Sequence, residues 1–229
     1  MRSSRWQAQG NVYLVAEGGP LTPERVRAEV GDADGILEVL GTGGDWVEIV
    51  IWNTDGSRAE LSGNGTRIAA RWLAERTGAS EVVVRVGPRE VRARMLGGDD
   101  VEQDMGAVTV GAAETVEGVT FTPVDVGNPH AVVEGDPAEL PRIGPLLETH
   151  PRFPERTNVQ VARRLGEGEI DARVWERGVG ETGSSGTSAV AVAAALGVSP
   201  ATIRFPGGAL AVRLEGGRAT LTGPAAREL

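Results

Sequence analysis

The chain of 229 residues contains no cysteine and no lysine, and its only histidines are His130 and His150. Without cysteine it forms no disulfides and no thiolate metal site, and it has no thiol nucleophile. Without lysine it cannot form the Schiff base that pyridoxal phosphate chemistry requires. Two histidines leave little for a metal cluster, so we expect no metal site. Any chemistry must come from carboxylates, hydroxyls, His130 or backbone dipoles.

Long apolar runs and excess positive charge are also missing. No apolar run reaches the roughly 18 residues of a membrane-spanning helix, and residues 1–17 lack the apolar core of a secretory signal. We therefore expect a cytoplasmic protein that does not enter membranes. The net charge of −9 argues against nucleic acid as the main partner.

One stretch, residues 174–195, reads as a strand, a glycine-rich turn and an apolar helix of alanine and valine. The first N–H groups of a helix have no partner within the helix, and they lie at the positive end of its dipole. Such an end binds anions. Because Ser184, Ser185 and Thr187 stand at this turn, we expect small hydroxyl side chains beside a bound anion. The helix has no polar face over 189–196, so we expect it to be buried on all sides.

The same device occurs earlier, in residues 53–73, where Ser62 precedes a glycine-rich turn and a second apolar helix. Aligning Ser62 with Ser185 separates the two units by 185 − 62 = 123 residues, about half the chain. Such self-similarity predicts two related lobes, each presenting a helix N-terminus. Two such ends could hold one small anion between them.

The other segments read mostly as short strands, which do not fit a doubly wound parallel sheet. The expected helices are 22–30, about 65–76, 140–147 and one that includes 189–196. The expected strands are 9–17, 36–40, 46–52, 81–86, 89–95, 108–110, 119–126, 131–134, 158–162, 169–175, 203–205, 209–214 and 219–221. We therefore predict an α+β fold of two pseudo-symmetric lobes, each a curved, mainly antiparallel sheet wrapped around a central apolar helix. The predicted lobes are 1–112, completed by a C-terminal strand at about 218–229, and 113–217.

Seven segments in order give the chain a more specific identity. They are Gly10-Asn11, 33–35, 53–67, 127–132, 157–161, 176–189 and 221–225. On these residues the chain resembles the diaminopimelate epimerase family, whose members invert one α-carbon without a cofactor. The resemblance covers nearly the whole chain, and it implies the two-lobed fold that the repeat predicts. It also implies a small amino-acid substrate and a homodimer.

The resemblance implies a mechanism in which two cysteines, one at each helix N-terminus, remove and return the α-proton from opposite faces. In this chain the matching positions are Ser62 and Ser185, so both acid/base residues are replaced. A thiol has a reference pKa of about 8.5, whereas a serine hydroxyl is far less acidic. A helix dipole contributes about 0.3–2 kcal/mol, which is too little to bring the pKa of a serine hydroxyl down to that of a thiol. Proton transfer by these serines would therefore need an auxiliary base.

The family's substrate-binding residues are matched in this chain, whereas its two acid/base residues are not. The family's cradle for the reacting carboxylate matches Gly63, Asn64, Gly186 and Thr187. Its pocket for the distal amino-acid head matches Asn11, Asn53, Asn128, Asn158, Glu176 and Arg177. A guanidinium such as that of Arg177 can bind a carboxylate through two parallel hydrogen bonds. An aspartate that commonly follows the first asparagine is Val12 here.

Simpler interpretations stay open for each of these residues. Serines are common helix N-caps, Glu176 and Arg177 could form a structural ion pair, and His130 could be a packed histidine.

Two other functions also fit the sequence. One is an isomerase or lyase with His130, Glu176 or Asp34 as its single base, and the other is a non-catalytic amino-acid-binding protein. The serines could be natural or a recombinant substitution, although the absence of every other cysteine favours a naturally cysteine-free chain.

Overall fold

The computed structural model describes residues 2–228, which form two compact units. The N-terminal unit comprises residues 2–104 together with 222–228, and the C-terminal unit comprises 105–221. This division, between residues 104 and 105, lies before the boundary at 112/113 that the sequence predicts. Within the described residues, no helix is long and apolar enough to cross a membrane.

Strands dominate the N-terminal unit, with one short and one long helix. Its elements are β1 (Arg2–Ala8), β2 (Asn11–Glu17), α1 (Pro23–Glu29), β3 (Gly35–Thr42), β4 (Trp46–Asn53), β5 (Arg58–Ala59), α2 (Gly63–Thr77), β6 (Glu81–Val86), β7 (Arg89–Gly97), the first part of β8 (Asp100–Ala107) and β19 (Ala226–Arg227). The chain leaves this unit along β8 and returns to it along β18 (Arg218–Pro224).

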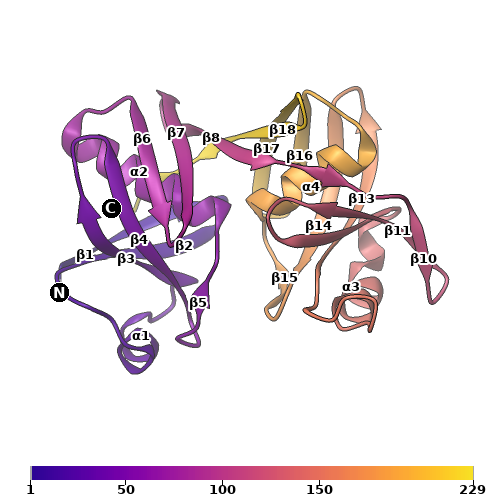
Figure 1. Ribbon diagram of the computed structural model, residues 1–229, viewed down its shortest axis with the longest axis horizontal. Helices are drawn as coiled ribbons and strands as arrows, with labels where there is room; N and C mark the ends of the chain where they lie inside the picture. The colour runs from indigo at the N-terminus through magenta and orange to yellow at the C-terminus, as the bar shows by residue number, and fades with distance from the viewer. Residues whose placement is uncertain (1, 229) are drawn as a thin grey trace. The chain divides into compact units, whose positions relative to one another are not determined.

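The C-terminal unit repeats this order of elements (Figure 1). Its elements are β9 (Thr109–Val110), β10 (Glu114–Val116), β11 (Val119–Asp125), β12 (Pro129–Glu134), η1 (Pro137–Glu139), α3 (Leu140–Glu148), β13 (Asn158–Gly166), β14 (Glu169–Glu176), β15 (Gly180–Thr182), α4 (Gly186–Leu196), β16 (Ala201–Phe205) and β17 (Gly208–Glu215).

Strand pairing shows that the sequence repeat is also a repeat of the fold. In the N-terminal unit β2 pairs antiparallel with β1 and parallel with β3, and β4 pairs antiparallel with β3 and parallel with β6. The C-terminal unit has the same pattern. There β12 pairs antiparallel with β11 and parallel with β13, and β14 pairs antiparallel with β13 and parallel with β16. The equivalent pairs β3–β4 and β13–β14 also each contain a register shift, at Val39/Gly41 and at Arg164/Gly166. The predicted α+β fold with mainly antiparallel strands is confirmed, and each unit includes the two parallel pairs named above.

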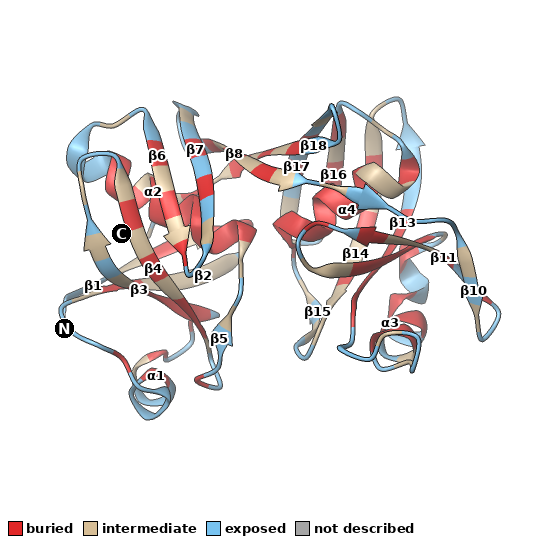
Figure 2. Cartoon of the chain, viewed as in Figure 1, coloured by how far each residue is buried: buried red, intermediate tan, exposed pale blue. Residues whose placement is uncertain are grey.

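A helix forms the centre of each unit. In α4, residues Ala189 to Ala193 are completely buried, and strands of the same unit surround them (Figure 2). Alanine and valine are small enough for the sheet to approach the helix closely, which explains a helix without a polar face. Gly78 and Gly197 end α2 and α4 in the left-handed conformation, with φ of 75° and 62°.

Candidate functional site

Ser62 stands at the N-terminus of α2, in the extended conformation of an N-cap. Its Oγ accepts a hydrogen bond from the Gly65 backbone N–H at 3.0 Å. The Tyr13 hydroxyl lies 3.3 Å from the same oxygen, and either group can donate. Ser62 is therefore a true helix cap, as the simpler interpretation holds, and its hydroxyl is also linked to β2 through Tyr13.

Ser185 occupies the equivalent position before α4, with φ −149° and ψ 130°, but its side chain makes no cap hydrogen bond. The residue is buried, and none of the residues from 2 to 228 forms a hydrogen bond with its hydroxyl. Neither α2 nor α4 carries an acidic residue in its first turn to neutralise the dipole. Both N-termini are thus chemically suited to an anion, and only Ser185 has its hydroxyl uncommitted to a cap.

Three of the predicted ligand-binding residues meet at the start of α2. The Asn64 side-chain amide donates to Asn11 Oδ1 at 2.6 Å. Arg67, which is fully buried, donates to Gly63 O at 3.1 Å and also to Asn64 Oδ1. Asn53 lies at the end of β4, where its amide donates to Ser57 Oγ at 2.9 Å. The structure therefore joins Gly63 and Asn64 to one buried guanidinium, and Asn11 joins this group through Asn64.

A second group of predicted residues meets beside β13 in the C-terminal unit. The Asn158 amide donates to Pro129 O at 3.0 Å, and its Oδ1 accepts from the Arg177 backbone N–H at 3.0 Å. The Arg177 guanidinium donates to Glu155 O at 3.4 Å. Asn158 therefore ties the segment that follows Asn128 to the turn that carries Arg177.

The Glu176 side chain lies at the end of β14 and accepts a hydrogen bond from Thr182 Oγ1 at 2.6 Å. Burial raises the pKa of its carboxyl, and the Thr182 contact partly opposes that rise. Asp34, another base considered from sequence, accepts from the Val12 backbone N–H at 2.7 Å. That contact makes Asp34 a support for β2, whereas Glu176 keeps the features of a group that can hold a proton.

His130 is buried on β12 between two amide side chains. Its Nε2 lies 2.9 Å from Asn128 Oδ1, and its Nδ1 lies 3.0 Å from Gln160 Nε2, which also donates to Ser188 Oγ at 2.9 Å. Because an amide nitrogen only donates, this arrangement makes Nδ1 an acceptor and places the ring proton on Nε2, facing Asn128. Burial lowers the pKa of His130 to about 3, and the nearby Arg177 charge also lowers it. His130 is thus a neutral ring that orients Asn128, and its one ring lone pair, on Nδ1, is occupied by the Gln160 amide.

The pH dependence of His130 can be predicted from that environment. A histidine with a folded pKa near 3 and an unfolded pKa near 6.5 binds fewer protons in the folded state between those values. Its contribution to the free energy of unfolding should therefore fall as the pH drops from about 6.5 towards 3, and be constant above 6.5. NMR of the ring Cε1–H should show no titration of His130 between pH 5 and 8. A midpoint near 6.5 would contradict the buried, neutral ring.

A buried glutamate supports the turn that bears Arg177. Glu148, the last residue of α3, accepts from the Gly178 backbone N–H and from the Trp175 indole, both at 2.7 Å. In the N-terminal unit Glu38 similarly accepts from the Trp52 indole at 2.8 Å and from the Leu21 backbone N–H at 2.7 Å. Sequence reasoning missed both glutamates, because nothing in a linear pattern marks a carboxylate that will be buried against an indole.

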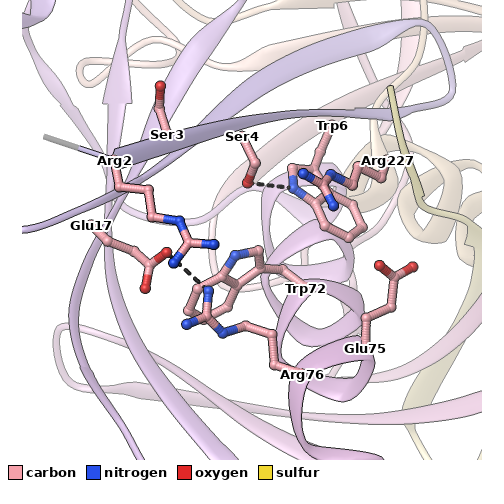
Figure 3. Close-up of a pocket in the computed structure, with 9 residues that line it drawn as sticks. All are labelled: Arg2, Ser3, Ser4, Trp6, Glu17, Trp72, Glu75, Arg76 and Arg227. Atoms are coloured by element: carbon pink, nitrogen blue, oxygen red, sulfur yellow. Dashed lines mark hydrogen bonds and ion pairs between the residues drawn. The ribbon is translucent and has the colours of Figure 1, made fainter. Parts of the chain in front are cut away.

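Two surface hollows lie elsewhere on the N-terminal unit. One, of about 240 Å³, is lined by side chains from β1 and the C-terminal end of α2 (Figure 3). There the Arg76 guanidinium stacks on the Trp72 ring and pairs with Glu17 at 2.9 Å. The other, of about 400 Å³, is lined by residues of β4, β5 and the β6–β7 turn. Neither hollow is lined by a residue that the sequence analysis placed in the site.

Comparison with known proteins agrees with the architecture and the motifs. The family model for diaminopimelate epimerase matches residues 122–227. The chain is 33% identical to the diaminopimelate epimerase of a Synechocystis species, over 98% of this chain and 95% of the relative. It is 42% identical to that of Thermobifida fusca, over 76% of this chain and 68% of the relative.

Solved structures share the fold at much lower identity. A phenazine biosynthesis protein of the PhzF family from Enterococcus faecalis superposes with a TM-score of 0.73 at 11% identity, covering 99% of this chain and 96% of that one. A hydroxyproline epimerase from Agrobacterium vitis with bound trans-4-hydroxy-L-proline gives 0.69 at 17% identity, covering 99% and 88%. The identity to curated relatives over nearly the whole length places this cysteine-free chain in the diaminopimelate epimerase family.

Proposed function

We propose that the protein binds a diaminopimelate-type amino acid and inverts its α-carbon without a cofactor, converting the LL form to the meso form. The observation that carries this proposal is the duplicated helix start. At the same topological position, each unit presents a serine in the N-cap, followed by a glycine that opens a buried helix. In the proposal the two ends share one substrate α-carboxylate, and Ser62 and Ser185 take the acid/base positions on opposite faces of the α-carbon.

The backbone N–H groups of α2 and α4 suit the electrostatic part of this reaction. Removing the α-proton puts negative charge on the α-carbon and its carboxylate, and preorganised N–H groups stabilise such charge as it develops. In the proposed cradle these groups belong to Gly63, Asn64, Gly186 and Thr187. This contribution does not depend on cysteine, so the serine protein keeps it.

The distal amino-acid head would be held by the remaining matched residues, Asn11, Asn53, Asn128, Asn158, Glu176 and Arg177. The hydrogen bonds around Asn158 and His130 support this assignment, because they fix the Asn128 amide and the Arg177 turn before any ligand arrives. With that substrate the protein would belong to the synthesis of lysine and peptidoglycan precursors in the cytoplasm. The family resemblance favours a homodimer.

A second candidate is a protein that binds the amino acid without turning it over. It is favoured by the surroundings of the two hydroxyls. Ser62 contacts the Gly65 N–H and Tyr13, and within residues 2–228 neither serine hydroxyl has a histidine or carboxylate as a hydrogen-bond partner. Serine is a poor base without such a partner, so proton transfer by the serine pair should be slow.

Incubation with LL- and meso-diaminopimelate in D₂O separates these functions. Loss of the α-proton NMR signal with formation of the other isomer supports epimerisation by the serine protein. Thermal stabilisation by the ligand without α-proton exchange supports the binding protein. Exchange without inversion, or loss of water from the substrate, would instead indicate a different isomerase or lyase with a single base. If the ligand changes neither the spectrum nor the melting temperature, the proposed substrate is wrong.

A further inference from the structure

Arg67 is a buried cation in a place that does not favour one. Its side chain is completely inaccessible to solvent, and burying an ion without a counter-ion carries a large free-energy penalty. Its hydrogen-bond partners are all neutral oxygens: Gly63 O at 3.1 Å, Asn64 Oδ1, and Pro224 O at 3.4 Å. Within residues 2–228 no carboxylate lies within ion-pair distance of it. The guanidinium is therefore hydrogen-bonded but not neutralised.

The position of Arg67 along α2 adds to that cost. It lies near the start of the helix, where the macrodipole is positive and an acidic side chain would be the stabilising choice. Burial lowers the pKa of Arg67 to about 9, which still leaves the group charged at neutral pH. Burial, the lack of a counter-ion and the dipole all disfavour a cation here. Local features that oppose stability in this way are characteristic of functional sites.

The contacts of Arg67 lead directly to the proposed carboxylate cradle. Its guanidinium fixes Asn64 Oδ1, and the Asn64 amide in turn donates to Asn11 at 2.6 Å. Gly63, whose carbonyl also accepts from Arg67, contributes one of the N–H groups of that cradle. The positive charge of Arg67 next to these N–H groups would attract a carboxylate bound to them, because opposite charges interact strongly where water is excluded.

We propose that Arg67 is a positioning residue whose buried positive charge is neutralised by the substrate carboxylate at the start of α2. This inference rests on the proposed function for the location of that carboxylate. It adds that α2, and not only the serine before it, is built for an anion. It also predicts that Arg67 contributes more to the liganded state than to the free protein.

The test follows the backbone amide resonances of Gly63 and Asn64 by NMR during titration with sodium acetate and, separately, with meso-diaminopimelate. In the wild-type protein both anions should shift these resonances. Substitution Arg67→Met should weaken each response by at least roughly tenfold, because a charge partner of the anion is lost. Arg67→Lys keeps the charge without the planar fork, so it should recover part of the response. Arg71→Met, which removes a cation paired with Glu75 from the same helix, should bind as the wild type does.

The outcomes separate the two proposals. If acetate shifts the amides and meso-diaminopimelate does not, the substrate is wrong but the role of Arg67 stands. If Arg67→Met lowers the melting temperature yet binds both anions as the wild type does, Arg67 is purely structural and the inference fails. If neither anion shifts the wild-type amides, the inference also fails. Should Arg67→Met not fold, the wild-type Arg67 Nε–H resonance decides: it must shift with acetate while that of Arg71 does not.

Discussion

Restoring cysteine at both helix starts, as Ser62→Cys/Ser185→Cys, should raise the rate of α-proton exchange in diaminopimelate by about 10²- to 10⁴-fold, the usual range for positioned acid–base groups. A thiol titrates near pH 8.5, and a helix N-terminus favours its thiolate. Ser185 has no cap hydrogen bond to lose. Ser62 Oγ accepts from the Gly65 N–H at 3.0 Å and lies 3.3 Å from the Tyr13 hydroxyl, so the near-isosteric thiol should fit at both places. NMR in D₂O measures the exchange rate, and product analysis measures inversion.

The matched control for this gain places two cysteines elsewhere. Ser3→Cys/Ser80→Cys changes two exposed serines whose hydroxyls hold no hydrogen bond among the described residues, so the exchange rate should stay that of the parent. Each single variant, Ser62→Cys or Ser185→Cys, should exchange protons from one face more readily than it inverts the centre. If the double variant folds, binds diaminopimelate and still exchanges no faster than the control, the serines do not occupy the acid/base positions.

Substitution Arg177→Gln should weaken binding of meso-diaminopimelate by roughly a hundredfold. A guanidinium that holds a carboxylate through two charge-assisted hydrogen bonds contributes about 1.5–3 kcal/mol per bond, and 1.4 kcal/mol corresponds to tenfold in affinity. The turn that carries Arg177 is fixed by Asn158 and, through Gly178, by Glu148, so the side chain is presented from a rigid support. Isothermal titration calorimetry measures the Kd.

Two variants show whether that loss is specific. Arg177→Lys keeps the charge but not the planar fork, and should lose about tenfold. Arg142→Gln removes an exposed cation of α3 that pairs with Glu139, and should leave the Kd unchanged, because exposed pairs contribute about 0–1 kcal/mol. An Arg177→Gln protein with the Kd of the wild type would exclude Arg177 from the ligand site.

The central helices and most strands could be predicted because their patterns are local. The apolar run of α4 follows a glycine-rich turn and is rich in alanine, which favours a buried helix, and alternating apolar residues between turn signals mark strands such as β4 and β6. Strand β8 was missed because its alternation is Val101, Gln103, Met105: the middle residue is buried but polar, and Gln103 contacts Thr66 Oγ1 of α2 at 2.7 Å. Strand β1 was missed because its first four residues, 2–5, are all polar and show no apolar alternation.

In the candidate site, too, residues within local motifs could be predicted, whereas residues that depend on tertiary contacts could not. The proposed site residues that lie in a motif, such as Ser62, Asn64 and Arg177, can be named from sequence through the resemblance. The residues that hold them in place, including Tyr13, Glu148 and Gln160, contact them only in the folded chain. Their spacing in the sequence therefore does not predict these contacts. Arg67 lies within a matched segment, but its significance depends on complete burial without a carboxylate, which only the fold reveals.

The most direct measurement is a crystal structure of the serine protein with meso-diaminopimelate bound. The proposal requires one ligand α-carboxylate to accept hydrogen bonds from the first N–H groups of both α2 and α4. The hydroxyl oxygens of Ser62 and Ser185 should then lie on opposite sides of the α-carbon. A ligand held by one helix start alone, or two serine hydroxyls that face separate spaces, would contradict it.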